Sequence, residues 1–297
     1  MAANNIITVA DAKRLARNIT LVENELAGYE ELLRNLDTHD TPVIGITGSP
    51  GAGKSTLTDA LVGVLVAKGH KVGVLCVDPS SPFNLGAILG DRIRMSEWYV
   101  NPSVFIRSLG SRGNLGGLQA SIIEITDVMK SAGFDYIIVE TVGVGQSEVE
   151  IAGLADVTVV VLVPEGGDEI QTMKAGIMEI ADVFVVNKAD RPGADSYIKN
   201  LAAAFSPAMR RIAKNIPIVK TVASQKSGID ELYEAIKRFL DQPQSNERKE
   251  LLMADRAYHL IQKNRMKGVT RQLLFEELRK RQVKNLYAFI ATYDAGN

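Results

Sequence analysis

Cysteine is nearly absent from this chain, because Cys76 is the only one among 297 residues. A single thiol excludes an internal disulfide and is consistent with a reducing compartment. The three histidines, His39, His70 and His259, are scattered along the sequence. Proteins that carry a soft metal ion need clusters of cysteine or histidine. The sequence therefore argues against a metal-carrying protein.

A strong net charge and long apolar runs are missing as well. Lys and Arg total 34 against 35 for Asp and Glu, whereas a domain devoted to nucleic acid is normally basic. The longest apolar run, residues 157–163, is too short to cross a bilayer. Residues 1–16 also lack the apolar core of a secretion signal. We therefore expect a cytoplasmic protein with no nucleic-acid partner and no membrane partner.

What the chain does contain is a series of Val- and Ile-rich runs that alternate with helical patterns. Runs without polar alternation indicate strands that are covered on both faces. This order predicts an α/β fold with a doubly wound, mostly parallel sheet, in which ligands bind at the carboxyl ends of the strands. The expected strands are 43–47, 72–77, 104–106, 136–139, 157–163, 183–186 and 216–222.

Composition divides the chain into three parts. Residues 1–40 are expected to form an N-terminal helical extension, with a helix over 8–36 whose apolar stripe packs on the main domain or, alternatively, on a partner. Residues 41–242 contain all of the predicted strands. Residues 243–297 are rich in Arg, Lys and Leu, and two helices are expected at about 247–265 and 269–282. Their basic face is either solvated or used for dimerisation or partner docking.

The strongest motif is a phosphate loop that follows the first predicted strand and precedes a helical pattern. It matches GxxxxGK[ST], the pattern of a P-loop NTPase. Its glycines allow consecutive main-chain amides to point at an anion beside a helix N-terminus. We expect Lys54 to reach the β- and γ-phosphates and the Ser55 hydroxyl to bind Mg²⁺. The predicted nucleotide-binding residues are Gly48, Ser49, Pro50, Gly51, Ala52, Gly53, Lys54, Ser55 and Thr56.

A second motif, at the end of a later strand, indicates which base is bound. Asn187, Lys188 and Asp190 fit the pattern NKxD. The Asp190 carboxylate can accept hydrogen bonds from guanine N1–H and the exocyclic amine, whereas adenine presents a lone pair at N1. An unpaired buried polar group costs about 1–3 kcal/mol, and more when charged, which favours GTP over ATP. Asn187 is expected to fix the loop and contact the base, and the Lys188 stem to cover the base plane. The main chain of three further residues is expected to meet the base: Val222, Ala223 and Ser224.

Magnesium requires oxygen ligands in addition to Ser55. The acidic candidates are Asp78, Asp91 and Glu140, of which Asp78 and Glu140 directly follow predicted strands. Their position places them at the same edge of the sheet as the phosphate loop. A turn or capping carboxylate is the alternative interpretation for each, and it is most reasonable for Asp91.

Residues 140–143 occupy the place of the DxxG motif of many GTPases. The Gly143 amide is expected to bind the γ-phosphate and to release it on hydrolysis. Lys54, Glu140 and Gly143 are therefore the predicted catalytic residues. Arg107 and Arg112 are alternatives for an arginine finger, although ordinary surface arginines fit the sequence better. Phosphoryl transfer depends on positioning and charge neutralisation, so we predict slow hydrolysis that a partner raises.

These motifs, together with several further segments, resemble the MeaB/ArgK/MMAA family over roughly residues 40–240. The resemblance implies a GTPase of the SIMIBI class that binds GTP or GDP with Mg²⁺. It also implies a homodimer that gates adenosylcobalamin loading onto methylmalonyl-CoA mutase or a related acyl-CoA mutase and protects that enzyme. An isobutyryl- or hydroxyacyl-CoA mutase is an alternative partner. The segments that carry the resemblance are 78–82, 88–92, 115–117, 140–148 and 167–171.

The same resemblance implies roles for particular residues. Asp78, Asp91 and Glu140 correspond to acidic residues of the family's magnesium site. The segment 167–174 resembles an additional switch that links the nucleotide state to the mutase, through Asp168, Glu169, Gln171 and Lys174.

Three other functions remain open from the sequence alone. One is a GTPase that inserts metal into another enzyme, which the scarcity of Cys and His disfavours. Another is a kinase or ATPase linked to amino-acid transport, a function once attached to the ArgK name and disfavoured by the guanine motif. The third is a nucleotide-bound scaffold that does not hydrolyse.

Overall fold

The computed structural model describes residues 6–37, 39–78, 95–110, 121–141, 147–164, 180–204, 216–242 and 246–294. The chain forms two compact units, Met1–Ser245 and Asn246–Asn297. The first unit is built on a sheet with the strand order β3-β2-β4-β1-β5-β6-β7, in which every pairing between described strands is parallel. The strands are β1 Val43–Gly48, β2 Val72–Asp78, β3 Val104–Gly110, β4 Tyr136–Glu140, β5 Val157–Leu162, β6 Val183–Val186 and β7 Ile218–Lys220.

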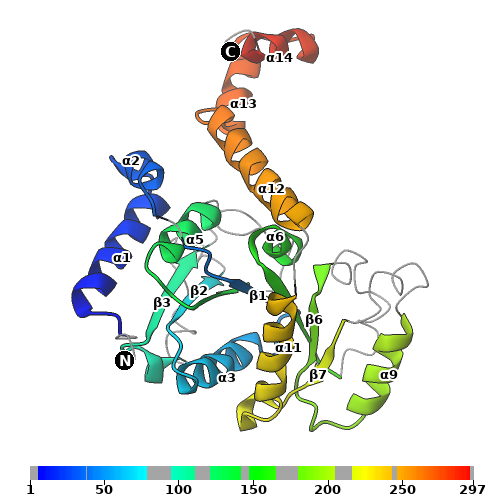
Figure 1. Cartoon of the computed structure of the whole chain (residues 1–297). Coiled ribbons are helices and arrows are strands. Elements are labelled where there is room, and N and C mark those ends of the chain that lie inside the picture. Colours follow the sequence, from blue (N-terminus) through cyan, green and yellow to red (C-terminus); the bar gives the residue numbers. More distant parts are fainter. Residues whose placement is uncertain are drawn as a thin grey trace. The chain divides into compact units, whose positions relative to one another are not determined.

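Helices cover both faces of this sheet, which explains why its central strands read as continuous apolar runs. Every residue of β1, β5 and β6 is buried. One face packs against α3 (Lys54–Ala67) and α11 (Ile229–Asp241). The other packs against α5 (Ile122–Lys130), α6 (Ser147–Leu154) and α9 (Ala194–Ala204), as Figure 1 shows. The predicted doubly wound α/β fold is therefore confirmed.

The N-terminal segment differs from the single helix expected over 8–36. It forms α1 (Val9–Glu23) and α2 (Tyr29–Arg34), because the chain turns between them with left-handed backbone at Glu25 (φ 47°) and Gly28 (φ 93°). The apolar stripe of α1 packs beside α5 in the core of the first unit, as one of the two sequence interpretations proposed. Its buried members are Leu15, Ile19 and Val22.

The second unit contains three helices where the sequence predicted two. They are α12 (Asn246–Arg265), α13 (Arg271–Lys280) and α14 (Leu286–Asp294). The additional helix α14 begins at an unpredicted cap, Asn285, whose side-chain oxygen accepts hydrogen bonds from the amides of Tyr287 (3.0 Å) and Ala288 (3.2 Å). Tyr293 of α14 donates to Glu277 of α13 at 2.9 Å. Within the described ranges, none of the helices is both long and apolar enough to cross a membrane.

Candidate nucleotide site

The phosphate loop leaves β1 at Gly48 and enters α3 at Lys54. Gly48, Gly51 and Gly53 all have positive φ, at 139°, 79° and 90°. A side chain at Gly48 would collide with the Val161 main chain, and one at Gly53 with the Asn187 amide. Glycine is therefore favoured at these positions by backbone conformation and, at Gly48, also by the close approach of the main chain of β5. The result is a tight loop at the carboxyl edge of the sheet, where a parallel α/β fold places its ligands.

Lys54 folds back over this loop. Its ammonium group donates to the carbonyl of Gly48 at 2.7 Å and to that of Ser49 at 3.0 Å, and its side chain is buried. The positive charge thus lies directly on the curled main chain instead of in solvent. This arrangement brings a fixed cation to the place where the loop's amides and the α3 N-terminus attract anions.

Ser55, in the first turn of α3, contacts Glu140 at the end of β4. The Ser55 hydroxyl donates to Glu140 Oε1 at 2.6 Å, and both side chains are buried. The structure therefore brings together two of the four predicted magnesium ligands. Asp78 ends β2 at the same edge of the sheet, where its main chain pairs with Gly110. Asp91, Gly143 and the predicted switch residues Asp168, Glu169, Gln171 and Lys174 lie outside the described residues.

Asn187, which is only 2% exposed, joins two loops. Its amide nitrogen donates to the carbonyl of Ala52 in the phosphate loop at 2.9 Å. Its amide oxygen accepts from the Thr221 hydroxyl at 3.0 Å and from the Ala223 amide at 3.1 Å. Ala223 begins η2 (Ala223–Gln225), the segment whose main chain was predicted to meet the base. These three hydrogen bonds show how Asn187 can fix the loop, as predicted. The Ala223 amide, which was expected to meet the base, donates to Asn187 in this structure.

The two remaining residues of the NKxD motif, Lys188 and Asp190, follow Asn187 in the chain segment after β6. Lys188 has left-handed backbone (φ 54°), and its ammonium group donates to the carbonyl of Gly51 at 2.8 Å. Asp190 is exposed to solvent. The contacts of Asn187 and Lys188 therefore fix the predicted base-reading segment against the predicted phosphate-binding segment.

Other contacts near the site carry no signal in the sequence. Thr47, just before the phosphate loop, accepts a hydrogen bond from the Thr141 hydroxyl at 2.9 Å. Trp98, in η1 (Ser96–Trp98), donates to Asp59 of α3 at 2.7 Å. Burial raises the pKa of Asp59, and the hydrogen bond from Trp98 opposes that rise. Each contact joins residues at least 39 positions apart, which only the fold brings together.

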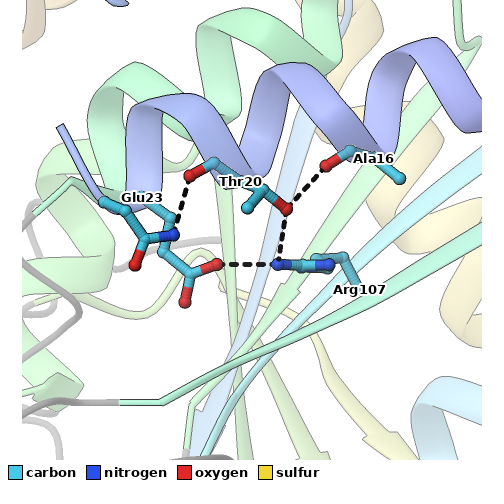
Figure 2. Close-up of polar contacts among 5 residues, drawn as sticks. Ala16, Thr20, Glu23 and Arg107 are labelled. Carbon is cyan, nitrogen blue, oxygen red and sulfur yellow. Dashed lines mark hydrogen bonds and ion pairs between the residues drawn. The ribbon is translucent and has the colours of Figure 1, made fainter. Parts of the chain in front are cut away.

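Arg107, one of the two alternatives for an arginine finger, is already engaged. Figure 2 shows its guanidinium group between two residues of α1, where it contacts the Glu23 carboxylate at 2.7 Å and the Thr20 hydroxyl at 3.2 Å. Burying a charge requires a partner of opposite sign, and Glu23 supplies it. In this structure Arg107 holds α1 to β3. Arg112 lies outside the described residues.

The family model described as methylmalonyl-CoA mutase-associated GTPase MeaB matches residues 15–280. The chain belongs to the MeaB family. GTPase ArgK of Escherichia coli is 39% identical to it over 236 residues, which are 75% of this chain and 70% of that protein. The mouse mitochondrial methylmalonic aciduria type A homolog is 35% identical over 251 residues, or 77% of this chain and 60% of that one.

A solved structure extends the likeness of this MeaB-family chain to its whole length. The crystal structure of LAO/AO transport system kinase superposes with a TM-score of 0.60 at 25% identity, covering 98% of both chains. With the family match, this confirms the predicted P-loop fold and the MeaB/ArgK/MMAA resemblance. The chain is accordingly a guanine-nucleotide-binding GTP hydrolase, as the sequence predicted.

Proposed function

We propose that this chain binds GTP with Mg²⁺, hydrolyses it slowly and uses the cycle to assist a cobalamin-dependent acyl-CoA mutase. Methylmalonyl-CoA mutase, or a relative of it, is the proposed partner, and the proposed role is to gate adenosylcobalamin loading and to protect the enzyme. The family description names an association with that mutase, and the mouse relative bears the name of methylmalonic aciduria. The contact of Asn187 with Ala52 carries the nucleotide part of the proposal.

In the proposed complex, Lys54 moves its hydrogen bonds from the loop carbonyls to phosphate oxygens. The ammonium group is already within 3.0 Å of two main-chain oxygens of the loop that is proposed to bind the phosphates. Charge-assisted bonds to phosphate are stronger than bonds to neutral carbonyls, which favours the exchange when nucleotide binds. At the other end of the nucleotide, Asp190 accepts from the guanine base.

The contact between Ser55 and Glu140 fits a magnesium site. Mg²⁺ binds oxygen at about 2.0–2.1 Å in an octahedron, so two adjacent ligands lie about 2.9 Å apart. The two oxygens are 2.6 Å apart here, and a small separation would make them adjacent ligands. The bound ion would neutralise charge on the phosphates. Asp78 and Asp91 are proposed as further acidic groups of this site, acting directly or through water.

Partner control is the remaining part of the proposal. Gly143 is proposed to bind the γ-phosphate, and Asp168, Glu169, Gln171 and Lys174 to pass the nucleotide state to the mutase. The helical unit of residues 246–297 is proposed as the arm of a homodimer. Many of its large apolar side chains are exposed, among them Leu251, Met253, Tyr258 and Phe275. Exposed apolar groups of this size are typical of surfaces that bind protein.

One competing function has an observation in its favour. The solved structure that matches over nearly the whole chain is named a transport system kinase. A kinase for an amino-acid transport protein would transfer phosphate to that protein and would usually take ATP. The NKxD residues favour GTP instead, because the Asp190 carboxylate would face the adenine N1 lone pair.

Single-turnover hydrolysis with GTP and ATP side by side distinguishes these functions. We expect phosphate release from GTP and not from ATP. The rate with GTP should rise when methylmalonyl-CoA mutase is added. Lys54→Ala serves as the variant that cannot hold nucleotide tightly. Preference for ATP would favour the kinase, and no phosphate release from GTP even with the mutase would favour a scaffold. A rate of GTP hydrolysis that is unchanged by every acyl-CoA mutase tested would contradict the chaperone role.

A further inference from the structure

The two threonines Thr47 and Thr141 are buried beside the candidate site. Thr141 falls within the segment 140–143, but no role was predicted for either side chain. Thr47 is the residue before Gly48, and Thr141 is the residue after Glu140. Their exposed fractions are 0% and 1%. The hydroxyl of Thr141 donates to that of Thr47 at 2.9 Å, a normal hydrogen-bond length.

The pair lies where the main-chain pairing of β4 with β1 ends. β1 and β4 pair in register up to Ile46 and Glu140, which ends β4. One more main-chain bond follows, from the Thr141 amide to the Ile46 carbonyl at 3.0 Å. The hydroxyl bond adds a side-chain link between the same two strands, one residue further on.

Glu140 and the threonine pair occupy opposite faces of the sheet. Successive residues of a strand point to alternate faces. Glu140 points toward α3, where it contacts Ser55, so Thr141 lies on the face covered by α6. A bond that fixes Thr141 on one face therefore fixes the backbone from which Glu140 reaches Ser55 on the other.

Helix α6 packs closely on β1 two residues before Thr47. Gly45 precedes Thr47 by two residues on the same face, and a Cβ there would lie 2.6 Å from the Ile151 side chain of α6. Real Cβ atoms do not approach so closely, so α6 is in contact with β1 at this point. With α6 covering β1 here and both hydroxyls shielded from water, a lost hydroxyl bond would not be replaced by a bond to bulk solvent.

We propose that Thr47 and Thr141 are positioning residues for GTP hydrolysis. Their hydrogen bond holds the end of β4 against β1 and thereby keeps the Glu140 carboxylate at Ser55. Neither threonine touches the nucleotide in this account. The inference rests on the proposed role of Ser55 and Glu140 in binding Mg²⁺, and it adds the residues that set their geometry.

The test is Thr47→Val, which removes the hydroxyl and keeps the branched shape of a strand residue. We expect single-turnover GTP hydrolysis to slow roughly threefold to tenfold, the range that one such hydrogen bond supplies. The Mg²⁺ concentration that gives half the maximal rate should rise by a similar factor. Affinity for GDP without Mg²⁺ should stay within about twofold, because the phosphate loop itself is unchanged.

Two further variants separate positioning from general damage. Thr47→Ser keeps a hydroxyl and should restore most of the rate. Thr47→Val combined with Thr141→Val replaces both partners by apolar groups, which is close to neutral for folding. The double variant should hydrolyse GTP no more slowly than Thr47→Val alone, because the two substitutions remove the same hydrogen bond.

Thr41→Val is the matched control. Thr41 is a buried threonine outside the nucleotide site, and its hydroxyl donates to the Phe134 carbonyl at 3.1 Å. Its loss should leave the rate and the Mg²⁺ dependence unchanged. An equal slowing in Thr41→Val, additive effects of the two valines, or a normal Mg²⁺ dependence in Thr47→Val would each overturn the positioning role. If the unmodified chain failed to hydrolyse GTP at all, the proposed function would fail instead.

Discussion

At the phosphate end of the candidate site the functional side chains are buried and already bonded to the protein, whereas at the base end Asp190 is exposed. Lys54, Ser55 and Glu140 bond to loop carbonyls or to each other. Between the two ends lies Asn187, whose amide bonds to both loops. The phosphate end is thus preorganised by many contacts. At the base end, the carboxylate predicted to read the base is exposed and follows the fixed residue Asn187.

This difference predicts that substitutions at the two ends will have different consequences. Changes at the phosphate end should weaken binding of every nucleotide, because triphosphate recognition does not depend on the base. Changes at Asp190 should alter the choice of base and leave folding intact. Changes at Asn187 should affect both, since it supports both loops.

The largest effect is expected for Lys54→Ala. Each charge-assisted bond contributes about 1.5–3 kcal/mol, so losing the ammonium group should weaken GDP and GTP binding by about 100-fold or more. Calorimetry with each nucleotide measures this. Lys68→Ala is the matched control, because Lys68 directly follows the other end of α3 and should leave affinity unchanged. A similar loss of nucleotide affinity in Lys68→Ala would mean that Lys54 has no specific role in binding the phosphates.

Asn187→Ala should have the next largest effect. Three hydrogen bonds disappear and their buried partners remain, each at a cost of about 1–3 kcal/mol that relaxation reduces in part. We expect the free energy of unfolding to fall by about 2–3 kcal/mol and GDP affinity to fall about tenfold. Urea denaturation and calorimetry measure the two. Asn285→Ala, which removes the cap of α14, should lower stability without any change in GDP affinity.

Asp190→Asn should exchange base preference without destabilising the chain. An asparagine can donate to the oxygen of xanthine, whereas it loses the paired acceptors for guanine, so preference should shift about tenfold to 100-fold toward xanthosine diphosphate. Competition between the two diphosphates measures the shift. Asp195→Asn is the control, because Asp195 is an exposed carboxylate in α9 that pairs with Lys220. An unchanged preference in Asp190→Asn would place the base elsewhere.

Lys188→Met should have the smallest effect. The methionine keeps an apolar stem for the base plane and loses only the bond to the Gly51 carbonyl, an exposed interaction. Affinity for GDP should fall about threefold, because solvent-exposed bonds contribute little. A loss as large as that of Lys54→Ala would show that the two ends of the site are coupled more tightly than their contacts indicate.

Much of this arrangement follows from sequence patterns. The apolar runs predicted a strand at the position of each of the seven described strands. The pattern is clearest in β1, β5 and β6, which are buried along their whole length, whereas the edge strand β3 extends beyond the predicted 104–106 through the partly exposed Arg107 and Ser108. Two motifs at strand ends, together with the acidic residues that close β2 and β4, then predicted the position of the nucleotide site. In a parallel sheet all carboxyl ends meet at one edge, so position along the chain is enough to predict proximity there.

Other features could not be predicted because they depend on contacts between distant residues. The bond between Thr47 and Thr141 joins residues 94 positions apart, and nothing in the sequence indicates that their hydroxyls meet. The engagement of Arg107 by Glu23 required knowing how α1 lies on β3. Local chemistry explains two other errors. The turn at Glu25 and Gly28 interrupts a continuous apolar stripe, and the Asn285 cap begins a short helix beyond the second expected helix, 269–282.

A crystal structure of this chain with a non-hydrolysable GTP analogue and Mg²⁺ would test the central claim most directly. The account predicts the phosphates on the main chain of residues 48–56, Mg²⁺ between the Ser55 hydroxyl and Glu140, and guanine against the Asp190 carboxylate. A base that lies away from Asp190 would contradict it. So would a Lys54 ammonium group that still bonds to the loop carbonyls and makes no contact with the phosphates.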